Sequence, residues 1–292
     1  MRSKRPIINK QIPIFIVFLV VFGGSCIAQR LAIVAPNDTD LDRRVSTELV
    51  SSLSEATRMQ DLEMTKAAFE SLRPDNVFNM TVGDARRVGS VIGSDFYIVV
   101  RSGTQKRAAL EKADYFEAFV SLFAISSRTG RLADWRLLSQ KAATENEAEN
   151  TLTKSLPPTA IEILKGLRSA ANDEAREATP PVLEEPPDPT SPAARNYRPP
   201  VPYRRVKPEY TRTAYLYDIT ATIEITVDLD DKGHISHTEI TRWAGYGLDE
   251  NVRRTVTTMN WRPAERDGKP LPTRFLLRYN FKKVEKDEPD NE

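Results

Sequence analysis

Apolar and polar positions alternate most regularly in the last third of the chain. Every second residue from 219 to 229 is apolar, and the residues between them are Thr, Glu or Asp. A period of two predicts a strand with one buried and one solvated face. The sequence DKG at 231–233 then predicts a turn, and HISHTEITRW at 234–243 predicts a returning strand. Residues 273–281 alternate again, with aromatic residues on the face predicted to be buried.

A helix is expected between the second and the third of these strands. Asp249 and Glu250 suit the positive end of its dipole, and Pro263 follows its last turn. Its apolar stripe recurs at helical spacing and consists of Leu248, Val252, Val256 and Met259. Three antiparallel strands with one helix on their apolar face therefore form an α+β module over residues 201–283.

Short apolar runs alternate with helical patterns over residues 30–171. DFYIVVRSG at 95–103 and YFEAFVSLFAIS at 115–126 predict buried strands. A helix is predicted over 82–92, and Gly93 is expected to end it. Strands that alternate with helices indicate a small α/β module with some parallel pairing.

Proline marks the boundary between the two predicted modules. Eight of the 20 prolines lie between positions 180 and 200, in a stretch that is also rich in Glu and Ala. Residues 172–200 contain too few bulky apolar side chains to bury a core, so we predict an extended linker there. The acidic tail at 284–292 is predicted to be disordered.

Residues 1–29 have the pattern of a signal peptide or a membrane anchor. Basic residues come before an uncharged apolar run at 12–22, and small residues follow it. Three outcomes stay open: cleavage after Ala28, lipid attachment at Cys26, or retention of residues 12–28 as an anchor. Because no second apolar run follows, each outcome places the rest of the chain in the periplasm, either free or anchored in the inner membrane.

The charged residues nearly cancel, with 42 basic and 41 acidic side chains. No overall field therefore favours nucleic acid as a partner. Cys26 is the single cysteine and His234 and His237 are the two histidines, so neither a cysteine-based zinc site nor a Ser–His–Asp triad is predicted. We expect no catalytic residue, no metal and no cofactor, and we expect a binding protein rather than an enzyme.

One motif imitates a calcium site. Asp228, Asp230 and Glu239 have the spacing of calcium ligands, but Lys232 stands at a ligand position. The flanking segments are also predicted strands, whereas a calcium loop of this type lies between helices. We therefore interpret the motif as a hairpin turn.

Several short motifs follow one another in the order of a known periplasmic module. They are Pro-Glu-Tyr at 208–210, a glycine at 233, Gly-Leu-Asp-Glu at 247–250, Trp-Arg-Pro-Ala at 261–264, Gly-Lys-Pro at 268–270 and the final strand at 275–281. As a set they resemble the carboxy-terminal domain of TonB-type proteins. The resemblance implies a module that grips an extended peptide of an outer-membrane partner.

In the TonB family, a short peptide of an outer-membrane receptor adds as a strand to the edge formed by the last strand. Backbone hydrogen bonds provide the affinity of such a contact. The resemblance thus implies partner-binding positions along the last strand, namely Arg274, Leu276, Arg278 and Asn280. The two arginines are open to two interpretations, because they are either charges that protect an exposed edge or contacts to an acidic partner.

A second resemblance concerns residues 30–171. The runs ARRVGSVIGSDFYIVVRSG and VSLFAISSRTGRLADW make this part similar to the small α/β domain of CsgG and of the amino-terminal part of TolB. One function implied is a TonB-like energy transducer that couples ExbB/ExbD-like inner-membrane proteins to an outer-membrane TonB-dependent receptor. The alternative is a periplasmic adaptor or envelope-assembly binding protein without transduction, because TonB-type anchors usually carry a histidine and none precedes His234 here.

Overall fold

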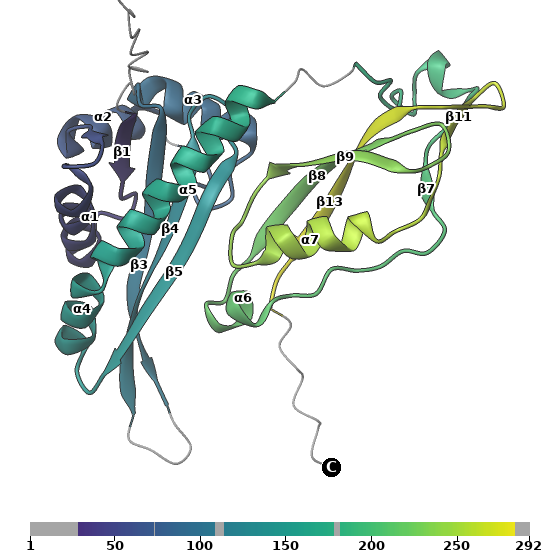
Figure 1. Cartoon of the computed structure of the whole chain (residues 1–292). Coiled ribbons are helices and arrows are strands. Elements are labelled where there is room, and N and C mark those ends of the chain that lie inside the picture. The colour runs from purple at the N-terminus through teal and green to yellow at the C-terminus, as the bar shows by residue number, and fades with distance from the viewer. Residues whose placement is uncertain (1–28, 73, 109–113, 178–181, 284–292) are drawn as a thin grey trace, which may run out of the picture.

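The computed structural model describes residues 29–72, 74–108, 114–177 and 182–283. Residues 1–28 of the segment predicted as a signal peptide or anchor, with Cys26 among them, and the tail at 284–292 lie outside the described residues. Figure 1 shows an α+β architecture with a larger amino-terminal sheet and a smaller carboxy-terminal one, so the predicted fold class is confirmed. Within the described ranges, no helix has the length and apolar character needed to cross a membrane.

The amino-terminal sheet has five strands in the order β2-β1-β3-β4-β5. Its strands are β1 (Arg30–Val34), β2 (Arg58–Met59), β3 (Phe96–Arg107), β4 (Tyr115–Ser126) and β5 (Leu132–Ala142). Strand β1 is parallel to β2 and β3, whereas β4 joins β3 and β5 in antiparallel fashion. The predicted parallel pairing is therefore present, combined with a long antiparallel hairpin.

Helices pack on this sheet, and their ends follow local sequence signals. They are α1 (Asp40–Leu53), α2 (Leu62–Leu72), α3 (Val82–Ile92), α4 (Glu145–Lys154) and α5 (Leu156–Arg176). Helix α1 begins with a capping box in which Thr39 and Asp42 each accept the other's backbone N–H. Helix α3 ends as predicted at Gly93, which adopts a φ of 74°. Helix α5 continues into the range predicted as a linker.

One face of the amino-terminal sheet packs on α1, α4 and α5, and Figure 1 shows α5 lying along β4 and β5. Leu122 of β4 points into this layer. Because side chains alternate between the faces of a strand, the next residue, Phe123, points to the opposite face. That opposite face meets the carboxy-terminal half of the chain.

The carboxy-terminal sheet has three antiparallel strands in the order β13-β8-β9. They are β8 (Ala221–Leu229), β9 (Ile235–Arg242) and β13 (Thr273–Phe281), and α7 (Leu248–Thr257) packs on their apolar face as predicted. Short elements complete this half: a 3-10 turn (Pro192–Ala194), β6 (Tyr197–Arg198), β7 (Val201–Pro202), α6 (Arg212–Leu216), β10 (Trp261–Arg262), β11 (Ala264–Arg266) and β12 (Lys269–Leu271). Strand β7 pairs with β10, and β11 lies between β12 and β6.

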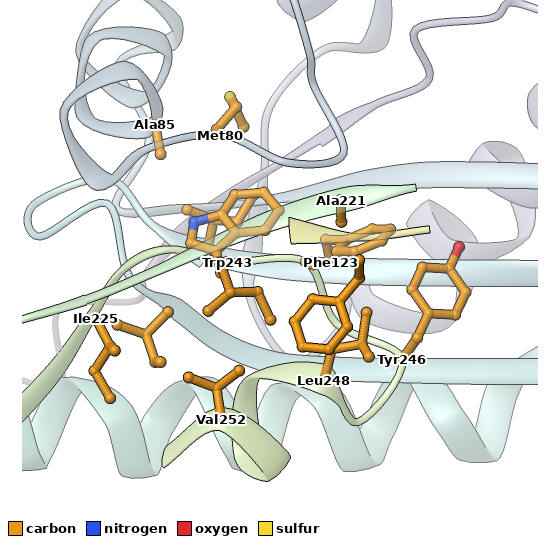
Figure 2. Packing of buried hydrophobic residues seen from close by; sticks show 14 of the residues in the cluster. Met80, Ala85, Phe123, Ala221, Ile225, Trp243, Tyr246, Leu248 and Val252 are labelled. Atoms are coloured by element: carbon orange, nitrogen blue, oxygen red, sulfur yellow. The ribbon is translucent and has the colours of Figure 1, made fainter. Parts of the chain in front are cut away.

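A single hydrophobic cluster joins the two sheets. It includes Met80 before α3, Phe123 of β4, and Trp243, Tyr246 and Leu248 from the carboxy-terminal half (Figure 2). The second face of the amino-terminal sheet is therefore partly covered by the smaller module. The division into modules at 30–171 and 201–283 stays a prediction.

Candidate functional site

Strand β13 forms one edge of the carboxy-terminal sheet. It pairs with β8 along its whole length, from Thr273 opposite Leu229 to Phe281 opposite Ala221. In the described part of the chain, its other side carries one isolated bridge, a parallel one between Thr273 and Glu184. The greater part of this side is therefore open.

Backbone groups of alternate β13 residues point to the open side. The N–H of Arg274 donates to the carbonyl oxygen of Glu184 at 2.9 Å, away from β8. Since the N–H and C=O groups alternate in direction along a strand, Leu276, Arg278 and Asn280 direct theirs the same way. These are the positions predicted from the TonB resemblance, and their role in partner binding stays a prediction.

The two arginines of β13 are engaged within the sheet. Arg274 donates to both carboxylate oxygens of Asp228, at 2.6 and 2.7 Å, and Arg278 donates to Glu224 at 2.9 Å. The register places each arginine directly opposite its carboxylate on β8. Asp228 is 1% exposed, so Arg274 neutralises a buried charge, and these hydrogen bonds raise the pKa of the Arg274 guanidinium. The sequence interpretation did not include these pairs, although the alternation of Glu224 and Asp228 on β8 was the available signal.

The other two predicted positions differ in character. Leu276 is the one large apolar side chain among the four positions, and it is 49% exposed. Asn280 accepts a hydrogen bond from the Thr222 hydroxyl at 2.8 Å. An added strand would therefore meet one apolar contact and one amide beside the paired arginines.

The opposite edge of the same sheet, β9, is held at one end by the amino-terminal half. Arg242 forms an antiparallel bridge with Thr81, and the N–H of Trp243 donates to the Met80 carbonyl at 3.4 Å. Asn79 completes this contact, because its side-chain N–H₂ donates to the carbonyl of Trp243 at 2.7 Å. The end of β9 is thus closed by backbone from another part of the chain.

The loop after β9 inserts aromatic side chains against the amino-terminal sheet (Figure 2). The ring centroid of Trp243 lies 5.8 Å from that of Phe123, and its indole N–H donates to the Gly130 carbonyl at 3.1 Å. The Tyr246 hydroxyl accepts a hydrogen bond from Ser121 at 3.0 Å. Both rings are 1% exposed, so the loop fixes the two halves to each other through buried contacts.

A cleft of about 550 Å³ lies where the turn before β5 meets β9 and α7. Arg131 crosses it and donates to Glu239 at 2.6 Å. Asp249 also lines it and accepts the N–H groups of Ala244 and Gly245. Burial raises the pKa of the Asp249 carboxyl to about 6, although the two N–H donors counteract the shift. Arg131 therefore links the turn before β5 to β9, whereas Asp249 fixes the backbone of the loop before α7.

The motif that imitates a calcium loop forms a hairpin turn. Asp230 accepts the N–H groups of Lys232 and His234, both at 2.8 Å, and Asp228 is bound by Arg274. In the ranges that the structure describes, no three His, Cys, Asp or Glu side chains gather in a way that could hold a metal ion. These residues therefore shape the turn between β8 and β9.

Comparison with known families identifies the carboxy-terminal half. Residues 206–282 match the family described as Gram-negative bacterial TonB protein C-terminal. The matched range contains β8, β9, α7 and β13. The predicted TonB-type carboxy-terminal domain is thereby confirmed, and the match supports a TonB-like cell-envelope protein built around a non-enzymatic domain family.

Solved structures are similar to parts of the chain. The solution structure of the Pseudomonas aeruginosa TonB carboxy-terminal domain is 18% identical and covers 36% of this chain and 98% of its own, with a TM-score of 0.27. Lipoprotein GNA1162 from Neisseria meningitidis is 13% identical and covers 51% of this chain and 99% of its own, with a TM-score of 0.32. None of the curated proteins compared with the chain matches it. The resemblance of residues 30–171 to CsgG and TolB stays a prediction.

Proposed function

We propose that the chain is a TonB-like envelope protein whose carboxy-terminal domain binds an extended peptide of an outer-membrane transporter as an additional strand on β13. The observation that carries this proposal is the open side of β13. There the backbone groups of Leu276, Arg278 and Asn280 have no strand partner among the described residues. Unpaired edge groups are a template for another chain, and strand addition uses them directly.

The side chains of β13 support this use of the edge. Arg274 and Arg278 reach across to carboxylates of β8, so both guanidinium groups are held over the sheet. The backbone on the open side therefore stays accessible. The exposed side chain of Leu276 offers an apolar contact to a neighbouring residue of an added strand.

Energy transmission from ExbB/ExbD-like proteins is the finer part of the proposal, and it requires residues 12–28 to be retained as an anchor. The packing of Trp243 on Phe123 favours the alternative, a non-transducing adaptor, because it fixes the TonB-type domain on the amino-terminal module. Mass spectrometry of the mature protein separates the two functions. A terminus at Gln29 supports the adaptor, whereas an uncleaved, membrane-bound chain supports transduction.

Photo-crosslinking in cells tests the proposed edge. A photoreactive residue at Leu276 is expected to capture an outer-membrane transporter, identified by mass spectrometry of the crosslinked peptide. The matched control carries the same residue at Ser236, which is exposed on β9. Capture of the transporter from Ser236 and none from Leu276 would contradict binding at β13.

A further inference from the structure

A segment of the predicted linker occupies the first position on the open side of β13. The carbonyl oxygen of Glu184 accepts the Arg274 N–H at 2.9 Å and the Thr273 hydroxyl at 2.7 Å. Its carboxylate is bound by the guanidinium of Arg266 on β11. Backbone and side chain of one acidic residue are thus held by three donors at the beginning of the strand.

The groups that hold Glu184 are themselves positioned by neighbouring strands. The guanidinium of Arg266 lies 5.5 Å from the ring centroid of Tyr197 on β6, over the ring face. The Tyr197 hydroxyl lies 3.3 Å from the Thr273 hydroxyl. The donors therefore belong to two strands, β11 and β13, and Tyr197 on β6 contacts a donor side chain from each of them.

The sequence after Glu184 explains why the linker follows β13 no further. Glu184 and Thr273 form a parallel bridge, so the next linker residue whose N–H would face β13 is two positions on. That residue is Pro186, and proline has no N–H to donate. Pairing stops after one residue, which leaves Leu276, Arg278 and Asn280 open.

We propose that Arg266, the Thr273 hydroxyl and the Arg274 N–H form a subsite for an acidic residue of the incoming strand, and that Glu184 occupies this subsite as a built-in competitor. This inference rests on the proposed strand addition. The partner it fits is an extended peptide parallel to β13, with Asp or Glu opposite Thr273 and no proline two residues later. Such a peptide replaces the contacts of Glu184 and continues along the edge.

Competition arises because Glu184 is covalently linked to the site it occupies. A tethered group has an effective concentration that a free peptide has to overcome. A partner peptide overcomes it by adding hydrogen bonds at Leu276, Arg278 and Asn280, which the linker cannot make. Loss of the Glu184 carboxylate therefore strengthens peptide binding, and loss of Arg266 removes the preference for an acidic first residue.

Binding of two synthetic peptides to the full chain tests the subsite. The probes are Glu-Ser-Val-Thr-Val-Thr-Ser and the same peptide with Gln in the first position. Each carries a fluorescent label, and the fluorescence anisotropy of the label measures binding. We expect the Glu peptide to bind more tightly by about two- to fivefold, the range of a partly exposed ion pair. E184Q is expected to tighten its binding, the matched control E185Q to leave it unchanged, and Arg266→Gln to equalise the two peptides.

The possible failures are distinguishable. Equal binding of both peptides, with no effect of E184Q, overturns the acidic subsite but leaves strand addition intact. Absence of binding by either peptide in every variant, together with no protection of the β13 amides in hydrogen exchange, overturns the proposed strand addition and with it the subsite.

A proline substitution tests the same inference without a peptide. Pro186→Val supplies the missing N–H, so we expect the linker to extend its pairing and to slow hydrogen exchange at the Leu276 amide. Pro187→Val is the matched control, because the N–H of that position points away from β13. Exchange at Leu276 that is unchanged by Pro186→Val contradicts the account of why the linker stops.

Discussion

The two edges of the carboxy-terminal sheet differ in what covers them. At β9, Arg242 pairs with Thr81, and the following loop buries Trp243 against the amino-terminal sheet. At β13, a single linker residue, Glu184, makes one bridge. Both edges belong to the same three-stranded sheet and each has one isolated bridge, but the end of β9 is also fixed to the amino-terminal sheet through the buried ring of Trp243.

This difference favours β13 as the edge for a partner. An exposed edge promotes aggregation unless it is covered or charged, and β9 is anchored at its Arg242 end by Thr81. Strand β13 instead carries arginines that are paired across the sheet, so its backbone stays free while its face is charged. Strand β9 is thus the edge whose end is fixed to the amino-terminal half, and β13 is the edge that we propose for binding.

The largest expected effect is at the end of β9. Trp243→Ala removes a ring that is 1% exposed and packs against Phe123, and we expect it to lower the free energy of unfolding by about 3–5 kcal/mol. Urea unfolding measures the change. Tyr203→Ala, at a side chain 76% exposed, is the control and should cost less than about 0.5 kcal/mol. Similar losses for the two variants would show that the β9 contact contributes little to stability.

The next effect concerns the two arginines of the open edge. Arg274→Ala leaves the buried Asp228 without its partner and should cost about 2–3 kcal/mol, less than a fully buried pair because Arg274 is 27% exposed. Arg278→Ala should cost no more than about 1 kcal/mol, since that side chain is 60% exposed. Thermal or urea unfolding of both variants gives the comparison, and equal costs would contradict the distinction.

A pH effect is expected from Asp249 at the junction. Its pKa is raised to about 6 by burial, so between pH 4 and 6 the folded state binds more protons than the unfolded one. The stabilising contribution of protonated Asp249 is fully present below pH 4 and is lost as the pH rises through 6. Asp249→Asn should remove this dependence, which amounts to about 1–2 kcal/mol because the side chain keeps some exposure. Parallel stability curves for the two proteins between pH 4 and 7 would contradict it.

The smallest effect on stability is expected from Leu276→Pro. The N–H of Leu276 points to the open side, so its removal breaks no bond to β8 and should cost at most about 1 kcal/mol. Leu276→Pro should nevertheless abolish binding of an added strand, because the N–H donor is missing. The control Leu276→Ala keeps this backbone N–H donor. Leu277→Pro is the contrasting variant, because its N–H faces β8 and its loss should cost about 3 kcal/mol. Unfolding and peptide binding are measured together.

Much of the smaller module could be predicted from the sequence. The alternation at 219–229 and 273–281 identified β8 and β13, and the apolar stripe identified α7, because strand and helix periods are local properties. The alternation of residues along a strand also relates Arg274, Leu276, Arg278 and Asn280 to one another, so that one of them on the open side of β13 places the other three there. Trp243 lies at the end of the predicted strand 234–243, but its partner Phe123 lies on another sheet and no local pattern connects the two.

Other features could be recognised only from the register of the strands or from contacts of the backbone. The pairing of Arg274 with Asp228 depends on how β13 aligns with β8, which sequence spacing alone does not fix. The contact of Glu184 uses its carbonyl group, so the Pro-rich composition of the linker gave no sign of it. A segment that lacks a core of its own can still make a specific contact when another element supplies the donors.

Hydrogen exchange of individual amides in the presence of a transporter peptide tests the central claim most directly. The peptide is the one recovered by crosslinking from Leu276. Its binding should slow exchange at the amides of Leu276, Arg278 and Asn280, while the amides of β9 keep their rates. Protection that appears along β9, or binding that leaves the three β13 amides unprotected, would contradict strand addition at the open edge.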